Sequence, residues 1–532
     1  MTTNDFIITT STEELIKRVN ALDQLKQHDT KEREAETTFH VDGLGKSIMA
    51  GYESLRNAAE YTESHTLFQR AMMRFFQRNF SGANDRQIDS LATELVVELT
   101  LSGYIENDTV TEKKMGVIKR LIREHWELYR KKQRVKGVDL KAYVIAPLAA
   151  RVEDVLFPYS KGFTVVQFAY EYFAKRYGHE LDKELDKRRA HLTLLVATAK
   201  ALLKPTEGAI RVDILSRYRM SVKNEADYIA MNRELDSIFK DSTTRRIERK
   251  VSNRSAPFRV LFRHIEKSGN IGDIKTNGSR FLTECSWTIK EVYESTGKAI
   301  RSGVIKSIVF LIITKTILGV AAEVPFDLVA EGAIRWTPLI INLAFPPVYM
   351  LMLSLTLGTP SEYNTKLLEK QIKAVLYEAE KDDKLVLNKS KSVDNLLGGA
   401  GHSGVFNFMY GVFFLSIIAV VSWFLLAFLH FNVASFIIFF VFVSTASFLC
   451  FRLSRLVREI EARNDGNQSF GQSLRDFLYM PFVTIGQWVS EKYAKINLVS
   501  NMLDLFVELP MKDVLRAIRR WNIFISSKKD EL

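Results

Sequence analysis

The chain has 532 residues, of which 47% are hydrophobic and 26% charged, and its formal net charge is +12. Its two cysteines, Cys285 and Cys450, are too few for a disulfide framework or a four-thiolate zinc site. The positive charge is compatible with nucleic acid, ribosomes or anionic lipid as a partner, and by itself selects none of them.

The chain up to residue 302 is charged and predicted to be helical. Residues 1–42 are polar with few apolar anchors, so we expect a flexible N-terminal segment that holds at most a loose helix. From 43 to 302, apolar residues recur every three or four positions, which predicts amphipathic helices around a shared core. Three such runs are Phe68, Met72, Phe75 and Phe76; Ile88, Leu91, Leu95 and Leu99; and Ile118, Leu121, Ile122, Trp126 and Tyr129.

Motifs for catalysis are weak in this region. The run GLGKS at 43–47 resembles the end of a phosphate-binding loop, but His40 stands where that motif needs glycine, and no hydrophobic strand precedes it. The histidines lack the paired spacing of a zinc peptidase, and no serine elbow or kinase signature occurs. We therefore predict a protein that is not an enzyme, with no metal and no cofactor.

Two basic clusters precede the apolar part of the chain. The first lies between Lys113 and Lys136, and the second contains Arg245, Arg246, Arg249, Lys250 and Arg254. Because the second lies shortly before the apolar part, we expect it to bind anionic lipid headgroups, at about 1 kcal/mol per basic residue. The alternatives are an ordinary solvated helix and, less favoured, nucleic acid.

Four apolar segments approach the roughly 20 residues that span a bilayer. They cover 303–320, 336–358, 405–429 and 433–451. The first is the weakest, because two lysines interrupt it. The predicted domains after 302 are therefore a first transmembrane pair at 303–358, a loop with a Gly-rich hinge at 359–404, a transmembrane hairpin at 405–451, and a tail at 452–532.

Basic residues in the flanks predict the orientation of these segments. Lys290, Lys298 and Arg301 precede the first segment, seven lysines lie in the 359–404 loop, and four arginines follow the fourth segment. Since basic loops stay inside, we expect a multi-pass protein of the cell inner membrane with both termini in the cytoplasm.

Polar side chains inside or beside the apolar segments are the best candidates for function. They are Lys306, Lys315, Glu323, Asp327 and Asn342. Such groups are unfavourable in lipid unless they are paired or face water, so they mark either an ion or substrate path or simple helix-to-helix contacts. In the second interpretation, which we favour, Lys306 reaches the inner surface and Asn342 hydrogen-bonds a neighbouring helix.

The C-terminal third carries a resemblance to a known family. The passages are INLAFPPVYMLMLSLTLGTPSEYNT at 341–365, PFVTIGQWVSEKYAKIN at 481–497 and LDLFVELPMKDVLRAIRRW at 503–521. Together they resemble an uncharacterised multi-pass membrane-protein family of small-genome candidate-phylum bacteria. The resemblance implies a bacterial inner-membrane setting and transfers no catalytic residues.

The expected fold is all-α, with a helical cytoplasmic domain, a four-helix transmembrane region and amphipathic C-terminal helices that are cytoplasmic or interfacial. The large helical mass and the lack of catalytic motifs favour a non-enzymatic membrane-anchored assembly or scaffold. We expect a homo-oligomer that contacts membrane lipids and a cytoplasmic protein partner, with nucleic acid disfavoured. The alternative is an oligomeric channel or transporter.

Overall fold

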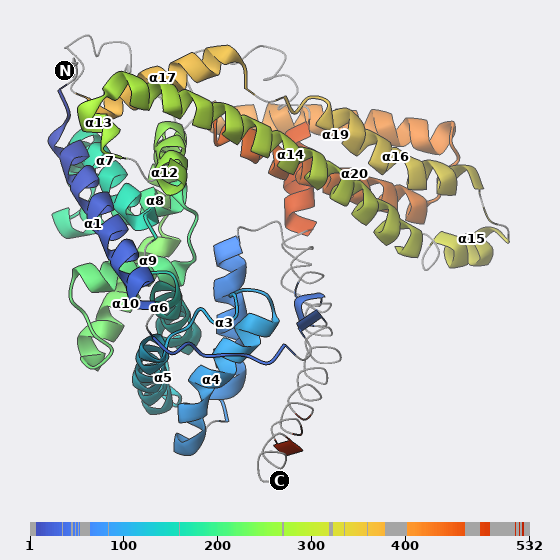
Figure 1. The fold of residues 1–532 in the computed structure, drawn as a ribbon. Coiled ribbons are helices and arrows are strands. Elements are labelled where there is room, and N and C mark those ends of the chain that lie inside the picture. The colour runs from blue at the N-terminus through green and yellow to red at the C-terminus, as the bar shows by residue number, and fades with distance from the viewer. Residues whose placement is uncertain are drawn as a thin grey trace. The chain divides into compact units, whose positions relative to one another are not determined.

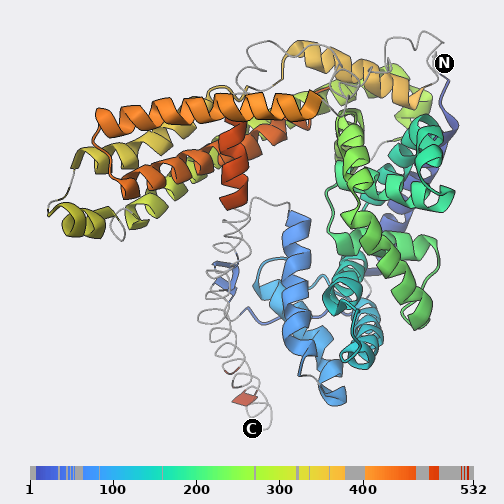
Figure 2. The ribbon, with the colours of Figure 1, turned by 180° about the vertical axis from the view of Figure 1, so that it is seen from behind.

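The computed structural model describes residues 7–53, 64–377, 402–462 and 479–489, with short gaps, and a few positions beyond 516. Every regular element in these ranges is a helix, so the predicted all-α class is confirmed. The chain forms two compact units, the N-terminal unit (Met1–Gly278 with Leu503–Leu532) and the apolar unit (Ser279–Met502). Figures 1 and 2 show their helices.

The N-terminal unit is built from short and medium helices joined by tight turns. Several helices begin at a capping side chain: Thr111, Asp186, Thr206 and Asp241 each accept a hydrogen bond from a backbone N–H of the first turn. The helices are α1 (Thr10–Arg33), α3 (Ser64–Phe80), α4 (Asp85–Leu101), α5 (Glu112–Lys132), the π-helix η1 (Lys141–Ile145), α6 (Ala146–Leu156), α7 (Gly162–Glu184), α8 (Lys187–Leu202), α9 (Glu207–Arg217), α10 (Glu225–Lys240), α11 (Ser242–Ser252), α12 (Ala256–Ser268) and α13 (Asp273–Thr276).

The apolar faces predicted from spacing meet in one core of this unit. Residues of α3, α4, α5 and α6 share a cluster in which Phe76, Leu95, Ile118 and Leu148 are fully buried. Edge-to-face aromatic contacts connect Phe75 with Phe76 and reach Tyr129 through Phe80. The helical periodicity therefore predicted which side of each helix is buried.

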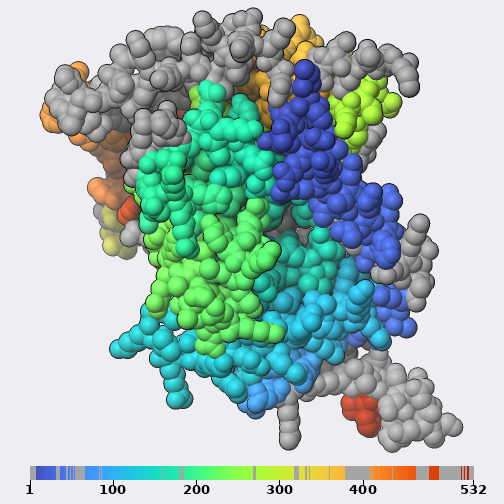
Figure 3. Space-filling view, turned by 90° about the vertical axis from the view of Figure 1, so that its left-hand side faces the viewer, coloured from blue at the N-terminus to red at the C-terminus, as the bar shows by residue number. Residues whose placement is uncertain are grey.

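Helix α1 differs from the expected loose N-terminal segment. It is a continuous helix of 24 residues that packs on α7, and the two surfaces lie side by side in Figure 3. Leu15, Ile16 and Val19 are buried, and Asp23 pairs with Lys161 at 2.7 Å. A helix was expected in this segment, and the structure adds that it is packed: three apolar side chains on one face, although few, are enough to hold a polar helix against a partner.

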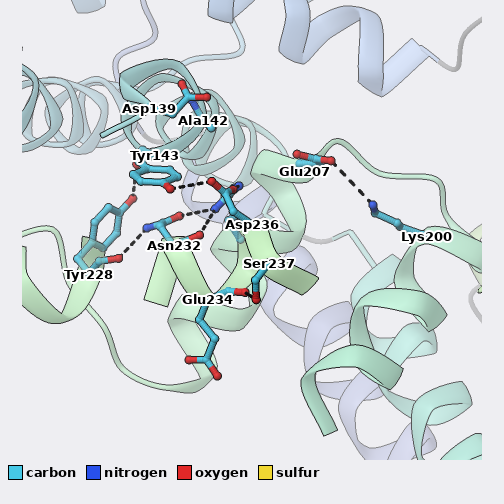
Figure 4. A network of polar contacts seen from close by, with 11 residues as sticks. Asp139, Ala142, Tyr143, Lys200, Glu207, Tyr228, Asn232, Glu234, Asp236 and Ser237 are labelled. Atoms are coloured by element: carbon cyan, nitrogen blue, oxygen red, sulfur yellow. Dashed lines mark hydrogen bonds and ion pairs between the residues drawn. The ribbon is translucent and has the colours of Figure 1, made fainter. Parts of the chain in front are cut away.

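A buried arginine joins α9 to α10 and η1. The side chain of Arg211 is 1% exposed; its guanidinium pairs with Asp236 and donates to Asn232 Oδ1 at 2.9 Å. The Tyr143 hydroxyl donates to the other Asp236 oxygen at 2.7 Å, and the Tyr228 hydroxyl donates to the Tyr143 carbonyl at 2.9 Å (Figure 4). The network thus satisfies most of the polar groups that these helices bury.

Aromatic rings complete the surroundings of this arginine. The Arg211 guanidinium lies 5.2 Å from the Tyr143 ring centre and 5.0 Å from that of Phe239. Burial tends to raise the pKa of the Asp236 carboxyl, but hydrogen bonds from Tyr143 and Arg211 outweigh it and hold that pKa below its usual range. Asp236 is therefore the counter-ion of a buried cation.

The apolar unit contains much longer helices. They are α14 (Gly278–Leu318), α15 (Val324–Glu331), α16 (Trp336–Ser354), α17 (Glu362–Leu376), α19 (His402–Ala427), α20 (Val433–Arg458) and a helix at 479–489. Figures 1 and 2 show α14 as one uninterrupted helix with α16, α19 and α20 beside it. Since α14 runs without a break from Gly278 to Leu318, the border predicted at 302 falls inside it.

Two of the four predicted spans are long and apolar enough to cross a membrane. These are Trp336–Ser354 and Ser435–Arg458. In α19 the apolar stretch Gly411–Ala427 is shorter, and the segment at 303–320 forms the end of α14. Two candidate spans make membrane association a reasonable expectation, while a four-span arrangement remains a prediction.

One face of α14 forms a narrow packing seam. Its buried positions follow each other every three or four residues: Ile300, Gly303, Val304, Ser307, Leu311 and Lys315. They pack against Met350 of α16 and Phe442 and Leu453 of α20. Small residues allow close approach here, since a Cβ on Gly303 would overlap the Leu453 side chain of α20.

Of the predicted flexible or surface segments, most lie outside the described residues. This holds for residues 378–401 of the predicted 359–404 loop with its Gly-rich hinge, although the last residues of that loop, from His402, belong to α19. The predicted amphipathic tail is described mainly at 479–489, which is helical as expected.

Asp236→Asn is expected to lower the free energy of unfolding by about 3–5 kcal/mol, because it leaves the Arg211 guanidinium buried without a counter-charge. Denaturant titration of the full chain in detergent measures the change. Glu234→Gln on the same helix is the control: its ion pair with Arg188 is exposed, and its loss is expected to matter by less than about 1 kcal/mol. Equal effects of the two variants would contradict the assignment.

Candidate functional site

Four of the five polar residues predicted beside the spans come together inside the apolar unit. Lys315, Glu323, Asp327 and Asn342 are each 0–3% exposed. Lys306 lies apart: its side chain is exposed on α14, on the same side as exposed Ile305 and Phe310. The structure thus separates one surface lysine from a buried polar cluster, which we name the Lys315 cluster.

Asn342 of α16 is the central member of the Lys315 cluster. Its Oδ1 accepts from Lys315 Nζ at 3.2 Å, and its Nδ2 donates to Glu323 Oε1 and, at 3.0 Å, to the Ser435 carbonyl oxygen. A neutral amide can do this because it offers both an acceptor and two donors. Asn342 therefore bridges the buried cation to the buried carboxylate and ties α14, α16 and α20 together.

The second carboxylate lies on α15. Asp327 Oδ1 accepts from Asn432 Nδ2, and Asn432 also caps α20, since its Oδ1 accepts from the Ser435 N–H at 2.7 Å. Glu323 comes directly before α15 in the chain, which places both acidic groups at the start of that short helix. The cluster thus draws on all four helices α14, α15, α16 and α20.

Besides its hydrogen bond to Asn342, Lys315 contacts an aromatic ring. Its Nζ lies 4.7 Å from the centre of the Phe442 ring on α20, a distance at which the ring face attracts a cation. Lys315 occupies the last described buried position of the α14 seam, so the helix geometry itself directs this side chain between α16 and α20. A lysine at this point must be held by its neighbours, because water does not reach it.

Sequence reasoning missed three members of the cluster: Asn432, Ser435 and Phe442. Asn432 stands in the three-residue turn between the last two apolar segments, and an Asn before an apolar run is a helix-capping signal that could have identified it. Ser435 contributes its backbone carbonyl, and no side-chain pattern reveals which carbonyl a distant amide will meet. Phe442 is one of many phenylalanines in its segment.

The predicted lipid-binding residues lie on and just after α11. Arg245, Arg246, Arg249 and Lys250 are exposed on one side of this helix, while Thr244, Ile247 and Val251 are buried on the opposite side, where α11 packs on α8. Arg254 is different, because its guanidinium is half-buried and contacts the Tyr177 hydroxyl and ring. We name the first four residues the α11 basic face.

Five residues of the other basic cluster form ion pairs with acidic neighbours. On α5, Lys131 and Lys132 both pair with Glu225, at 2.7 and 3.0 Å, and Arg130 pairs with Asp85 at 3.5 Å. Arg123 pairs with Asp89 and Lys114 with Asp29. These ion pairs reduce the positive charge that the α5 cluster presents to an anionic partner.

Among the described residues, no group of three or more His, Cys, Asp or Glu side chains is placed to hold a metal ion. Comparison of the chain with family models, with curated proteins and with solved structures finds no match. The Lys315 cluster and the α11 basic face are therefore the two candidate sites, and both rest on physical argument alone.

Lys315→Met is expected to destabilise the protein by about 3 kcal/mol, because the buried Glu323 carboxylate then loses the cation that Asn342 bridges to it. Lys306→Met, on the exposed side of the same helix, is the matched control and is expected to change stability by less than about 0.5 kcal/mol. Denaturant titration in detergent measures both.

The double variant Lys315→Met with Glu323→Gln distinguishes the contribution of the Lys315 charge from that of its packed aliphatic stem. It removes one cation and one anion together, so it is expected to recover at least half of the loss. No recovery would mean that the lysine stem, and not its charge, holds the helices.

Proposed function

We propose that this chain is a non-enzymatic membrane-anchored assembly protein, in which the apolar unit is the anchor and the N-terminal unit is the part that meets partners. The proposal includes four spans, both termini in the cytoplasm and a homo-oligomeric state. It is in keeping with the family resemblance carried by residues 341–365, 481–497 and 503–521.

The apolar surface of the anchor is the observation that carries the proposal. Large apolar side chains are 48–66% exposed on α14, α16 and α19, among them Ile305, Val309, Ile340, Val348 and Val420. A water-soluble unit rarely leaves so many large apolar groups in solvent, whereas lipid favours them. Exposed Trp336 and Trp423 suit the boundary between lipid and water.

The N-terminal unit supports the second half of the proposal. Its apolar side chains point into its own core, and its polar groups are used in structural contacts such as the Arg211 network. No arrangement of nucleophile, base and acid emerges among its described residues. A folded helical unit whose polar groups serve its own structure suits a role in binding and assembly.

The first experiment tests anchoring and assembly on the full chain. After alkaline washing of membranes, the chain is expected to stay in the pellet, and in lipid nanodiscs it is expected to form a defined oligomer by light scattering. Release by the wash would reject the anchor. A strict monomer that also retains no cytoplasmic protein in pulldowns would reject the assembly role.

We also propose that the α11 basic face contacts anionic lipid headgroups. Its four exposed cations, backed by a buried apolar face, resemble a surface helix that rests on a charged membrane. Nucleic acid, the other anionic partner, is disfavoured because the same chain carries a membrane anchor, which keeps lipid close by at all times.

Arg245→Glu with Arg249→Glu is expected to lower the binding of nanodisc-held protein to anionic vesicles by more than tenfold, at about 1 kcal/mol per basic residue removed. Flotation of phosphatidylglycerol vesicles, with neutral vesicles alongside, measures it. Arg123→Glu with Arg130→Glu on α5 is the control, since both arginines are already paired. Equal loss in the two variants would refute a specific α11 contact, and retention of RNA in place of vesicles would identify the other partner.

A second candidate function is an oligomeric channel or transporter. The observation in its favour is the Lys315 cluster, because buried charges between apolar helices commonly belong to ion or proton pathways. Ion and proton flux into proteoliposomes tests it, and no flux would leave the anchoring function alone.

A further inference from the structure

The exposed surface of α14 changes from cationic to apolar within a few turns. Arg301 and Lys306 are exposed cations, and the large exposed side chains that follow, such as Val309 and Ile313, are apolar. The stretch 295–318 contains no acidic residue, so no side chain of that stretch neutralises the two cations. Helix α14 therefore presents positive charge directly beside an apolar surface.

Helix α20 makes the same change in the opposite direction. It carries no charge from Val433 to Phe451 and then exposes Arg452 and Arg455, and the whole stretch 433–458 lacks acidic residues. At about 1.5 Å per residue its uncharged part is roughly 28 Å long, close to the roughly 30 Å of a bilayer's hydrocarbon core. The two arginines thus lie where a helix that crosses such a core would leave it.

The packing of α14 against α20 brings the two changes to one level. Lys315 lies against Phe442, and a Cβ on Gly303 would overlap the Leu453 side chain, so the helices are antiparallel and close at that point. Figures 1 and 2 show them side by side. Two exposed cations of α14 therefore lie at the height of two exposed cations of α20. We name these four residues the boundary cations: Arg301, Lys306, Arg452 and Arg455.

A polar joint follows on the side of this level that faces away from the apolar surface. Asn364, in the first turn of α17, donates to the Tyr293 hydroxyl at 2.6 Å. The same amide donates to the Ile460 carbonyl oxygen at 3.0 Å and accepts from the Ala462 N–H at 2.7 Å. This joint ties α14 and α17 to the end of α20, so the boundary cations lie between an apolar layer and a polar one.

We propose that the boundary cations bind the phosphate groups of anionic phospholipids, whose acyl chains lie along the apolar surfaces of α14 and α20. The proposal rests on the membrane anchoring proposed above and adds to it the class of lipid and the level at which the headgroups lie. It concerns the apolar unit and is separate from the α11 basic face.

The chemistry of a phospholipid matches both surfaces at once. Its phosphate meets the cations and its hydrocarbon meets the apolar side chains, whereas RNA or an acidic protein would use the cations alone. A zwitterionic headgroup carries its own ammonium, which competes with the protein for the phosphate. A net negative headgroup therefore suits a level where four cations gather and neither helix supplies an acid.

Helix α17 offers a matched control within the same unit. Lys366 and Lys370 are exposed there, and Glu369 between them accepts a hydrogen bond from the Ser286 hydroxyl of α14. Ser286 precedes Arg301 by about four helical turns, or roughly 22 Å. This exceeds the Debye length of about 8 Å, so headgroups at the boundary cations would not feel these lysines.

The test is a titration of the detergent-solubilised full chain with phosphatidylglycerol or phosphatidylcholine, with bound lipid counted by native mass spectrometry. The chain is expected to prefer phosphatidylglycerol. Lys306→Gln with Arg455→Gln is expected to weaken that binding at least about tenfold and to leave phosphatidylcholine unchanged. Lys366→Gln with Lys370→Gln is expected to bind as the unaltered chain does. Unchanged phosphatidylglycerol binding in the first variant, or equal loss in both, overturns the proposal.

A charge-retaining variant separates charge from folding. Lys306→Arg with Arg455→Lys is expected to keep the preference for phosphatidylglycerol, and its loss there overturns the proposal. If the first variant does not fold, Arg301→Gln with Lys306→Gln replaces it, with the same tenfold loss expected and unchanged binding overturning the proposal.

Other occupants give different results. Glycerol phosphate, which lacks acyl chains, is not expected to displace the lipid, and displacement at equal concentration would reveal a site for free phosphate and overturn the proposal. Retention of RNA or an acidic protein without any preference for phosphatidylglycerol also overturns it. A chain that resists the alkaline wash without this preference keeps the anchor and loses the headgroup site; a chain that washes off but shows the preference does the reverse.

Discussion

Charge that is buried between apolar helices has to be balanced, and the apolar unit is arranged around this constraint. Lys315 lies in the α14 seam, where leucine, valine and serine occupy the neighbouring buried positions. Its ammonium group can stay there only because Asn342 Oδ1 accepts a hydrogen bond from it and Phe442 presents a ring face. The positions of α15, α16 and α20 around this point follow from the same requirement, since each supplies a member of the cluster.

The N-terminal unit also buries a cationic side chain, and compensates its charge in a different way. Arg211 is as deeply buried as Lys315, but it is paired directly with Asp236, and its guanidinium also donates to Asn232. A planar fork with five donors can be satisfied by a few well-placed acceptors, whereas the compact ammonium of Lys315 reaches its carboxylate partner through an amide. The arginine site is thus a direct ion pair, whereas at the lysine site an amide stands between the cation and the carboxylate.

This difference bears on function. An anchor needs only helices that pack and face lipid, and the α14 seam with its small residues would provide that without any charge. The presence of three ionisable groups in the same helices is therefore more than anchoring demands. The α11 basic face would add a surface through which the N-terminal unit responds to anionic lipid.

The sequence alone determined the helical class, the apolar faces of α3, α4 and α5, and the candidate status of Lys315, Glu323, Asp327 and Asn342, because helical period and hydropathy are local properties. It did not reveal that α1 packs on α7, that basic residues of α5 pair with acidic side chains such as Glu225, or that Lys306 stays outside the cluster. These were decided by tertiary structure, since ion pairs such as Lys131 with Glu225 and bridges such as Asn342 with the Ser435 carbonyl join residues about a hundred positions apart. Which distant groups meet depends on how whole helices pack, and no local pattern contains that information.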